Sequence, residues 1–141
     1  MQIFLSFAYE EDREQVNGFR SMLENPRANI NFTDGSCKKD YGIRSDSAIK
    51  QYISTLIDQS SVTVCLISRY TKTSKWVLWE LEASRSKGKG IVGIILKDKQ
   101  NEIGSYSDCP AIIDGNRYKA YYWAEPQKLQ QYIEEAERNR Q

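Results

Sequence analysis

Short apolar segments alternate with amphipathic ones along this chain, and this alternation limits its fold more than any other feature. The apolar segments, which we predict to be β-strands, are 2–7, 30–33, 61–67, 91–96 and 118–123. The amphipathic segments, which we predict to be helices, are 13–24, one beginning at residue 45 or 46, 75–87 and 127–138. Strands separated by helices of this length indicate right-handed βαβ units and a parallel sheet covered on both faces.

Two of these strands, 61–67 and 91–96, are apolar along their whole length and are therefore expected at the centre of the sheet. We predict an α/β fold with five parallel strands in the flavodoxin-like order 2-1-3-4-5. At 141 residues, the chain is expected to form a single domain over 1–141. We expect Asp12 to cap the first helix, and the acidic run Glu10, Glu11 and Asp12 to reflect the preference for negative charge at a helix start.

The chain has no histidine, which excludes serine–histidine and cysteine–histidine catalysis, histidine metal sites and histidine phosphotransfer. An enzyme with this composition depends on carboxylates for charge stabilisation. The three cysteines (Cys37, Cys65 and Cys109) lack CxxC spacing, which argues against a zinc site and suits a reducing cytoplasm. The net charge of +1 predicts no nucleic-acid partner, and the lack of a long apolar run predicts no membrane partner. The lack of histidine and of CxxC spacing predicts no bound metal.

The sequence supports neither of two common nucleotide-binding motifs, nor the phosphoacceptor site of a receiver domain. The glycines of segment 88–93 match GxGxxG, but they lie between a helix and a strand, whereas a dinucleotide site needs the order strand, glycines, helix. No GxxxxGK[ST] sequence occurs. A phosphorylated receiver domain needs an aspartate after the third strand, where this chain has Ser68 and Arg69.

In a doubly wound sheet, ligands bind at the carboxyl ends of the strands, where the strand order reverses. This rule selects the segments 6–9, 33–38 and 68–80. Within the last of them, Trp76 and Glu80 are four residues apart and share a helix face, which we place at the margin between the core and a cleft. We expect Val77, Leu78 and Leu81 to form the neighbouring inner stripe, and Glu82 to point outward.

A partly desolvated glutamate in such a cleft is typical of a catalytic carboxylate. The alternative is a large core tryptophan beside a solvated glutamate, and periodicity alone does not decide between the two. We assign Trp79, about 100° around the helix from Glu80, to packing or to a subunit contact.

Five segments, in order, resemble the TIR-like domains of the bacterial Thoeris anti-phage defence system, the ThsB family. They are IFLSFAY (3–9), DGS (34–36), VTVCLI (62–67), Trp76-x-x-x-Glu80 and GIVGI (90–94). The WxxxE element is also similar to that of the wider class of TIR domains that consume NAD. The resemblance covers roughly residues 1–98 and fades beyond Asp98.

The resemblance implies that Glu80 cleaves the bond between nicotinamide and ribose, and that the product is an ADP-ribose-derived signalling nucleotide, expected to be cyclic. NAD is then a substrate, and no cofactor is implied. The resemblance also implies a homo-oligomer and a separate effector protein that senses the product. Such a chain is expected in the cytoplasm.

Several residues near the predicted cleft are candidates for binding the substrate: Ser6, Phe7, Ala8, Tyr9, Asp34 and Trp76. Phe7 and Tyr9 offer rings for stacking, Ala8 leaves room for close approach, and Ser6 offers a hydroxyl donor. Asp34 is a candidate for the ribose hydroxyls. The alternatives are a packed strand end for Phe7 and Tyr9, and a turn-forming role for Asp34.

Six basic residues near this helix provide a local excess of positive charge that suits a pyrophosphate or, alternatively, a solvated helix face: Arg69, Lys72, Lys75, Arg85, Lys87 and Lys89. The turn-rich segment 99–117 is a candidate lid or determinant of the product. Two alternative functions stay open at this point. One is a non-catalytic TIR-type assembly module, and the other is a domain that binds a nucleotide as a sensor.

Overall fold

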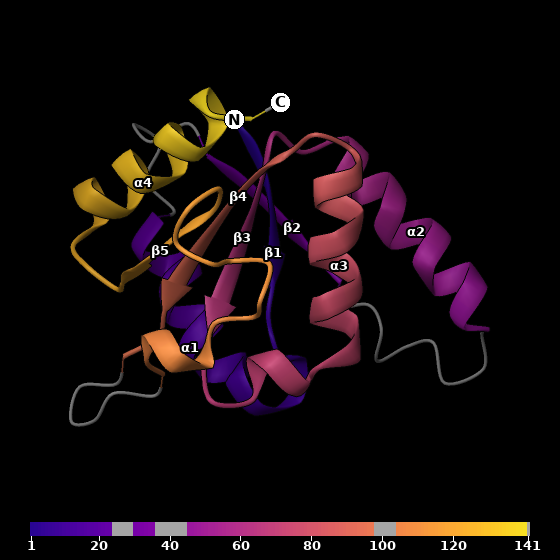
Figure 1. Ribbon diagram of the computed structural model, residues 1–141, viewed down its shortest axis with the longest axis horizontal. Helices are drawn as coiled ribbons and strands as arrows, with labels where there is room; N and C mark the ends of the chain where they lie inside the picture. Colours follow the sequence, from indigo (N-terminus) through magenta and orange to yellow (C-terminus); the bar gives the residue numbers. More distant parts are fainter. Residues whose placement is uncertain (24–29, 36–44, 98–103, 141) are drawn as a thin grey trace.

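Five parallel strands form one sheet at the centre of the molecule (Figure 1). The computed structural model describes residues 1–23, 30–35, 45–97 and 104–140. The strands are β1 (Gln2–Ser6), β2 (Asn31–Asp34), β3 (Val62–Ile67), β4 (Gly90–Ile95) and β5 (Lys119–Tyr122). Their order, β2-β1-β3-β4-β5, confirms the predicted fold class.

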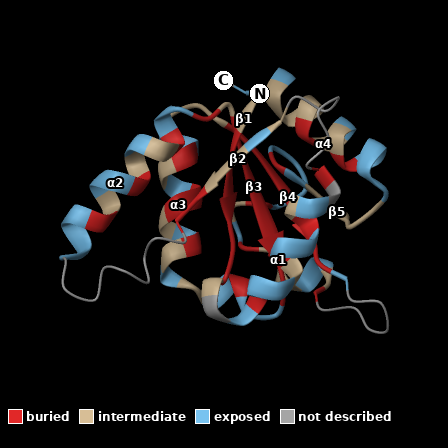
Figure 2. Ribbon diagram, turned by 180° about the vertical axis from the view of Figure 1, so that it is seen from behind, coloured by how far each residue is buried: buried red, intermediate tan, exposed pale blue. Residues whose placement is uncertain are grey.

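Four α-helices cover the sheet, two on each face. They are α1 (Tyr9–Leu23), α2 (Asp46–Asp58), α3 (Lys75–Ser86) and α4 (Pro126–Arg138). Helices α1 and α4 pack on one face, and α2 and α3 on the other, so that β1, β3 and β4 are almost entirely buried (Figure 2). The edge strands β2 and β5 are largely half-buried. Among the described residues, the short 3-10 helices η2 (Thr71–Thr73) and η3 (Tyr106–Asp108) lie in the connections after β3 and β4.

The alternation of side chains along β1 decides which residues reach which pair of helices. Ile3 and Leu5 belong to the cluster formed with α1 and α4, whereas Phe4 packs on the buried isoleucines of α2. Because successive side chains of a strand point to opposite faces, Ser6 shares the face of Phe4, and Phe7 shares the face of Leu5. Ser6 and Phe7 therefore lie on opposite faces of the sheet.

One predicted helix boundary is wrong. Helix α1 begins at Tyr9, so Asp12 lies inside the helix instead of capping it. Asp12 is also buried, on the same stripe as Val16, Phe19 and Leu23. The expectations for the side chain of Glu10, and for Ser36, Cys37 and 99–103, concern residues or side chains outside the described part of the chain.

The connection after β4 returns to the sheet at Gly104. A Cβ atom at this position would lie 2.6 Å from the Ile67 carbonyl oxygen and 3.1 Å from the Ser68 Cα atom. Ile113 and Tyr118 then pack with Ile67 in the cluster beneath α3. The described part of this connection, from 104 onward, is therefore packed against the carboxyl end of β3.

No helix within the described ranges is long and apolar enough to cross a bilayer.

Two glycines provide a matched test of the packing. A Cβ atom at Gly90, where β4 begins beneath α4, would lie 2.4 Å from the Ala136 carbonyl oxygen, whereas one at Gly18, on the exposed side of α1, meets Trp123 at 3.8 Å. We expect Gly90→Ala to lower the free energy of unfolding by about 1–3 kcal/mol through overpacking. Gly18→Ala should raise it by about 0.5–1 kcal/mol, because alanine favours a helix interior. Urea denaturation measures both, and a Gly90→Ala variant as stable as the parent would contradict the close approach.

Candidate active site

The carboxylate of Glu80 lies at the carboxyl end of β1. Ser6, the last residue of β1, donates a hydrogen bond from Oγ to Glu80 Oε1 at 2.8 Å. Glu80 is 1% exposed and Ser6 is fully buried. The site therefore lies where β1 and β3 are neighbours and the strand order reverses, which is the position that the sheet topology predicts for a ligand.

Helix α3 presents Glu80 because of where the helix begins and which of its faces is apolar. The Ser74 side chain caps the helix by accepting a hydrogen bond from the Val77 amide at 3.4 Å. The buried positions of the helix are Val77, Glu80, Leu81 and Ser84. Glu80 is thus part of the stripe that faces the sheet, and it does not lie at the cleft margin as expected.

A second polar contact continues this stripe. Ser84 Oγ donates to the Glu80 carbonyl oxygen at 2.8 Å and lies 2.6 Å from Thr63 Oγ1 of β3. Leu78, which we predicted to be on the inner stripe, is instead 43% exposed. The buried face is centred on Leu81 and Ser84, and Leu78 points away from it. Glu82 is exposed and pairs with Arg85, as the periodicity predicted for an outward position.

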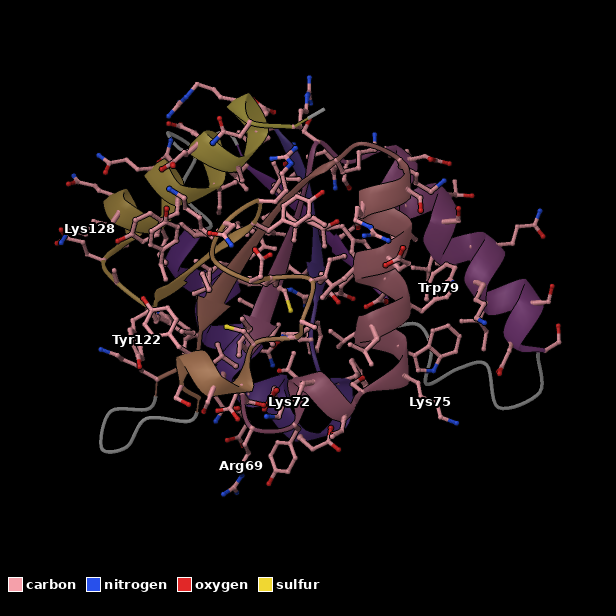
Figure 3. The ribbon with its side chains drawn as sticks, viewed as in Figure 1. Arg69, Lys72, Lys75, Trp79, Tyr122 and Lys128 are labelled. Atoms are coloured by element: carbon pink, nitrogen blue, oxygen red, sulfur yellow. The ribbon has the colours of Figure 1, made fainter. Side chains whose placement is uncertain are left out.

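Trp76 lies one turn before Glu80 and is half-buried. Its ring is 6.3 Å from that of Trp79 in an edge-to-face arrangement, and both rings pack on the cluster that α2 contributes. Trp79 lies between α3 and α2 (Figure 3). The packing role assigned to Trp79 is confirmed, and Trp76 shares that packing.

The aromatic residues after β1 pack on the face of the sheet that α1 and α4 cover. Phe7 is buried in the core cluster with α1 and α4, on the opposite face from Glu80. Ala8 is buried at the turn. Tyr9 begins α1, with its ring 5.6 Å from that of Phe7 and with the Arg13 guanidinium 5.4 Å from its centroid.

Asp34, the last residue of β2, is buried and pairs with Arg20 of α1. Its carboxylate is therefore held on the α1 face. Among the predicted site residues, the structure brings Ser6, Trp76 and Glu80 together on the α3 side. It places Phe7 and Asp34 on the other side.

The basic residues also separate into two groups. Arg69, Lys72 and Lys75 lie between the end of β3 and the first residue of α3, along the same edge as the end of β1 (Figure 3). The other three lie at the far end of α3. There Lys87 Nζ is 2.6 Å from Asp58 Oδ1, Lys89 Nζ is 3.0 Å from the Asp58 carbonyl oxygen, and Arg85 pairs with Glu82.

Cys65 of β3 is a neighbour of Ser6 in the strand register. Burial raises the pKa of the Cys65 thiol well above its usual range, so the sulfur stays protonated and is a poor nucleophile. Within the described residues, no three side chains of histidine, cysteine, aspartate or glutamate gather into a group that suits a metal ion. The chemistry available at this edge is therefore that of a carboxylate, a hydroxyl and cationic side chains.

Sequence reasoning missed a second buried carboxylate at the same edge. Ser68 Oγ donates a hydrogen bond to Asp12 Oδ2 at 2.6 Å; Asp12 is 1% exposed and Ser68 is 0% exposed. Asp12, Val16 and Phe19 are four and three residues apart, as on one face of a helix, and this spacing could have indicated that Asp12 is buried. Burial raises the pKa of Asp12, and Glu11 raises it further, whereas the hydrogen bond from Ser68 and the charge of Arg69 lower it.

Comparison with known proteins agrees with this fold. The family model described as "Thoeris protein ThsB, TIR-like domain" matches residues 4–101. A Bacillus cereus (strain MSX-D12) protein named "Putative cyclic ADP-D-ribose synthase ThsB1" is 32% identical over 127 residues, covering 84% of this chain. The chain spans 65% of the length of that relative. This chain belongs to the TIR-like domain family of the Thoeris protein ThsB, which confirms the resemblance drawn from its motifs.

Two solved structures share the fold at low sequence identity. The Clostridium botulinum CMP N-glycosidase BcmB aligns with a TM-score of 0.56 and 12% identity, covering 95% of this chain and 98% of that protein. A 2-deoxyribosyltransferase from Bacillus psychrosaccharolyticus aligns with a TM-score of 0.60 and 17% identity, covering 94% of this chain and 92% of that protein. These likenesses concern the fold alone.

The raised pKa of Asp12 predicts a pH-dependent contribution to stability. Because the folded pKa lies above the ordinary value of 3.8, this group favours the folded state below pH 3.8 and loses that contribution as the pH rises through the folded pKa. Asp12→Asn removes the titration while its amide oxygen still accepts from Ser68. The free energy of unfolding of the variant minus that of the parent should therefore increase as the pH rises above 3.8, and then level off. Urea denaturation across this pH range measures the difference, and a decrease would mean that folding lowers the pKa of Asp12.

Proposed function

We propose that this chain cleaves the N-glycosidic bond between nicotinamide and ribose in NAD, with Glu80 as the catalytic carboxylate. The observation that carries the proposal is the buried Glu80 side chain, fixed by Ser6 at the carboxyl edge of the sheet. The further step, closure of ADP-ribose to a cyclic nucleotide, is supported by a relative named for cyclic ADP-D-ribose synthesis.

The reaction suits a site that relies on a carboxylate. When the bond between ribose C1′ and the ring nitrogen breaks, the electron pair goes to the cationic nicotinamide ring, which leaves as a neutral molecule without a general acid. Positive charge then develops on the ribose as an oxocarbenium ion. A fixed carboxylate stabilises that charge, and more strongly where water is excluded. An acceptor atom of the same ADP-ribose then attacks C1′ and loses its proton.

The hydrogen bond from Ser6 gives Glu80 a fixed position before the substrate binds. Of the other substrate-binding candidates, Trp76 is on the same helix and Ala8 lies at the turn after β1, so we propose that both border the bound nucleotide. Tyr9 is half-buried at the start of α1 and packs on Phe7, and we propose that it borders the nucleotide from the α1 side. Phe7 and Asp34 have packing and ion-pair roles on the other face, and we assign them no contact with NAD in this conformation.

Binding also requires a change at the mouth of the site. Because Glu80 is 1% exposed, the side chains that cover its carboxylate must move before a ribose reaches it. The pyrophosphate would then lie near Arg69, Lys72 and Lys75, beside the N-terminal end of α3, whose dipole also favours anions.

A non-catalytic assembly module is the second candidate function. Tyr52 of α2 and Leu78 of α3 are 44% and 43% exposed, and the half-buried Trp79 lies between the same two helices. Exposed apolar side chains on two neighbouring helices suit a homo-oligomer. We propose that the enzyme also self-associates, and that a separate effector protein senses its nucleotide product.

Two glutamates on α3 allow a matched test of the catalytic role. Glu80→Gln keeps the size of the side chain and removes its charge, so nicotinamide release from NAD should fall by roughly a hundredfold or more. Glu82→Gln makes the same change at an exposed position on the same helix and should leave the rate near that of the parent. Chromatography of NAD incubated with each purified protein measures nicotinamide and identifies the ADP-ribose product.

The outcomes separate the two candidate functions. Loss of activity in Glu80→Gln alone supports catalysis by this residue. If the parent and Glu80→Gln release nicotinamide equally, Glu80 has no catalytic role. If the parent releases none at high concentration or in extracts of phage-infected cells, while it still self-associates, the assembly module is the better conclusion.

The two basic groups provide a second matched test. Replacing Arg69 and Lys75 by glutamine removes two charges near the proposed pyrophosphate position and should raise KM for NAD by roughly tenfold, with a smaller effect on kcat. The same replacement at Arg85 and Lys89 removes two charges from the other end of α3 and should leave KM near the parental value. Steady-state kinetics at low ionic strength measures both. Equal changes in the two double variants would indicate a general charge effect instead of a subsite.

A further inference from the structure

The Asp12–Ser68 hydrogen bond joins α1 to the residue that directly follows β3, across 56 residues of sequence. Its length of 2.6 Å is typical of a hydroxyl that donates to an ionised carboxylate, which is the stronger kind of hydrogen bond. Both side chains are buried. Asp12 takes no part in the chemistry proposed above, so a buried carboxylate at this edge needs another explanation.

Ser68 is the residue on which the loop 68–74 is organised. Its Oγ atom, besides donating to Asp12, accepts from the Tyr70 amide at 3.1 Å. Its amide donates to Thr71 Oγ1 at 2.8 Å, and its carbonyl accepts from the Thr71 amide at 3.2 Å. The Ser68 side chain thus contacts Asp12 and the Tyr70 amide, and the Ser68 backbone contacts Thr71, so that Ser68 as a whole positions the start of the loop.

The same hydrogen bonds continue to the start of α3. The Ser74 amide donates to the Thr71 carbonyl oxygen at 3.1 Å, and the Ser74 side chain caps the helix at Val77. The helix that begins at this cap carries Trp76 in its first turn and Glu80 in its second. A continuous set of contacts thus leads from the Asp12 carboxylate to the helix that presents Glu80.

The loop is also held from the side of β4. The backbone of Gly104 lies against Ile67 and Ser68, and Lys72 Nζ donates to the Ser107 carbonyl oxygen at 3.0 Å. The loop is therefore fixed between α1 and the connection that follows β4. The packing of Gly104 against Ser68 on one side and the hydrogen bond from Ser68 to Asp12 on the other together fix the position of the loop.

We propose that Asp12 is a positioning residue, which acts through Ser68 and the loop 68–74 to fix the first turn of α3 and thereby the place of Glu80 relative to Ser6. Its effect on catalysis rests on the proposed function. Its effect on the loop does not. A displacement of reacting groups by about 1 Å is enough to lower a rate by about a hundredfold, so a small shift of α3 has a large kinetic effect.

Kinetics of two substitutions at Asp12 test the catalytic part. Asp12→Ala removes the acceptor and should lower kcat for NAD cleavage by roughly tenfold to a hundredfold; KM should rise as well, because the loop 68–74 carries Arg69 and Lys72. Asp12→Asn retains an acceptor for Ser68 and should recover most of the lost rate. Asp58→Ala removes an exposed carboxylate at the far end of α3 and should behave as the parent. A rise in KM with unchanged kcat, or an Asp12→Asn variant as slow as Asp12→Ala, would overturn the proposal.

The reciprocal variant tests whether the effect passes through Ser68. Ser68→Ala should lower kcat to a similar extent, and the double variant Asp12→Ala/Ser68→Ala should be no slower than either single variant, because all three lack the same contact. Multiplicative losses in the double variant would show that the two residues act separately. Circular dichroism and urea denaturation establish which variants fold, and Asp12→Asn keeps the comparison available if Asp12→Ala does not.

Amide hydrogen exchange gives a measure that needs no catalysis. In Asp12→Ala, exchange at Tyr70, Thr71 and Val77 should be faster by roughly tenfold or more, while the amides of α4 keep their parental rates. Unchanged protection of the loop would overturn the proposal, whether or not the parent cleaves NAD. Faster exchange in a chain that cleaves no NAD would refute the proposed function and leave the positioning of α3 by Asp12 established.

Discussion

The hydrogen bond between Ser6 and Glu80 connects helix α3 to the end of β1 in the interior of the molecule. It places a carboxylate in the interior of the protein, where an ionised group depends on hydrogen bonds for its stabilisation. The neighbouring elements are arranged around this contact: β3 is paired beside β1, Ser84 extends the polar stripe, and the Ser74 cap sets where α3 begins. A carboxylate held in this way is a physical requirement for stabilising positive charge at the edge of the sheet.

Much of the fold could be predicted from the sequence because it follows from local patterns. The two wholly apolar strands indicated the centre of the sheet, and the alternation with helices predicted the parallel order. Helix ends were predictable where a cap is local, as at Ser74. The start of α1 was not, because Asp12 is typical of a cap in sequence, and its hydrogen-bond partner Ser68 lies far along the chain.

The candidate site was predictable in part, for a similar reason. The WxxxE spacing identified the helix and the glutamate. The predicted inner stripe of Val77, Leu78 and Leu81 placed Glu80 at its margin, whereas the structure centres the buried face on Leu81 and Ser84. The partners that fix the acidic residues are all distant in sequence: Ser6 for Glu80, and Arg20 for Asp34. Such pairs depend on how the elements pack, and no local pattern contains them.

The contact of Gly104 with the end of β3 has a consequence for how the length of this chain can vary. At Gly104 the backbone of one connection touches the backbone at Ile67 and Ser68, so even a single added carbon has no space. At Gly115, in the same connection, an added Cβ atom would meet nothing within 4 Å, and the residue is exposed. Inserted sequence, such as a reporter peptide or an affinity tag, is therefore tolerable near the second glycine and not at the first. The connection thus contains both an attachment point for engineering and a fixed support for the site.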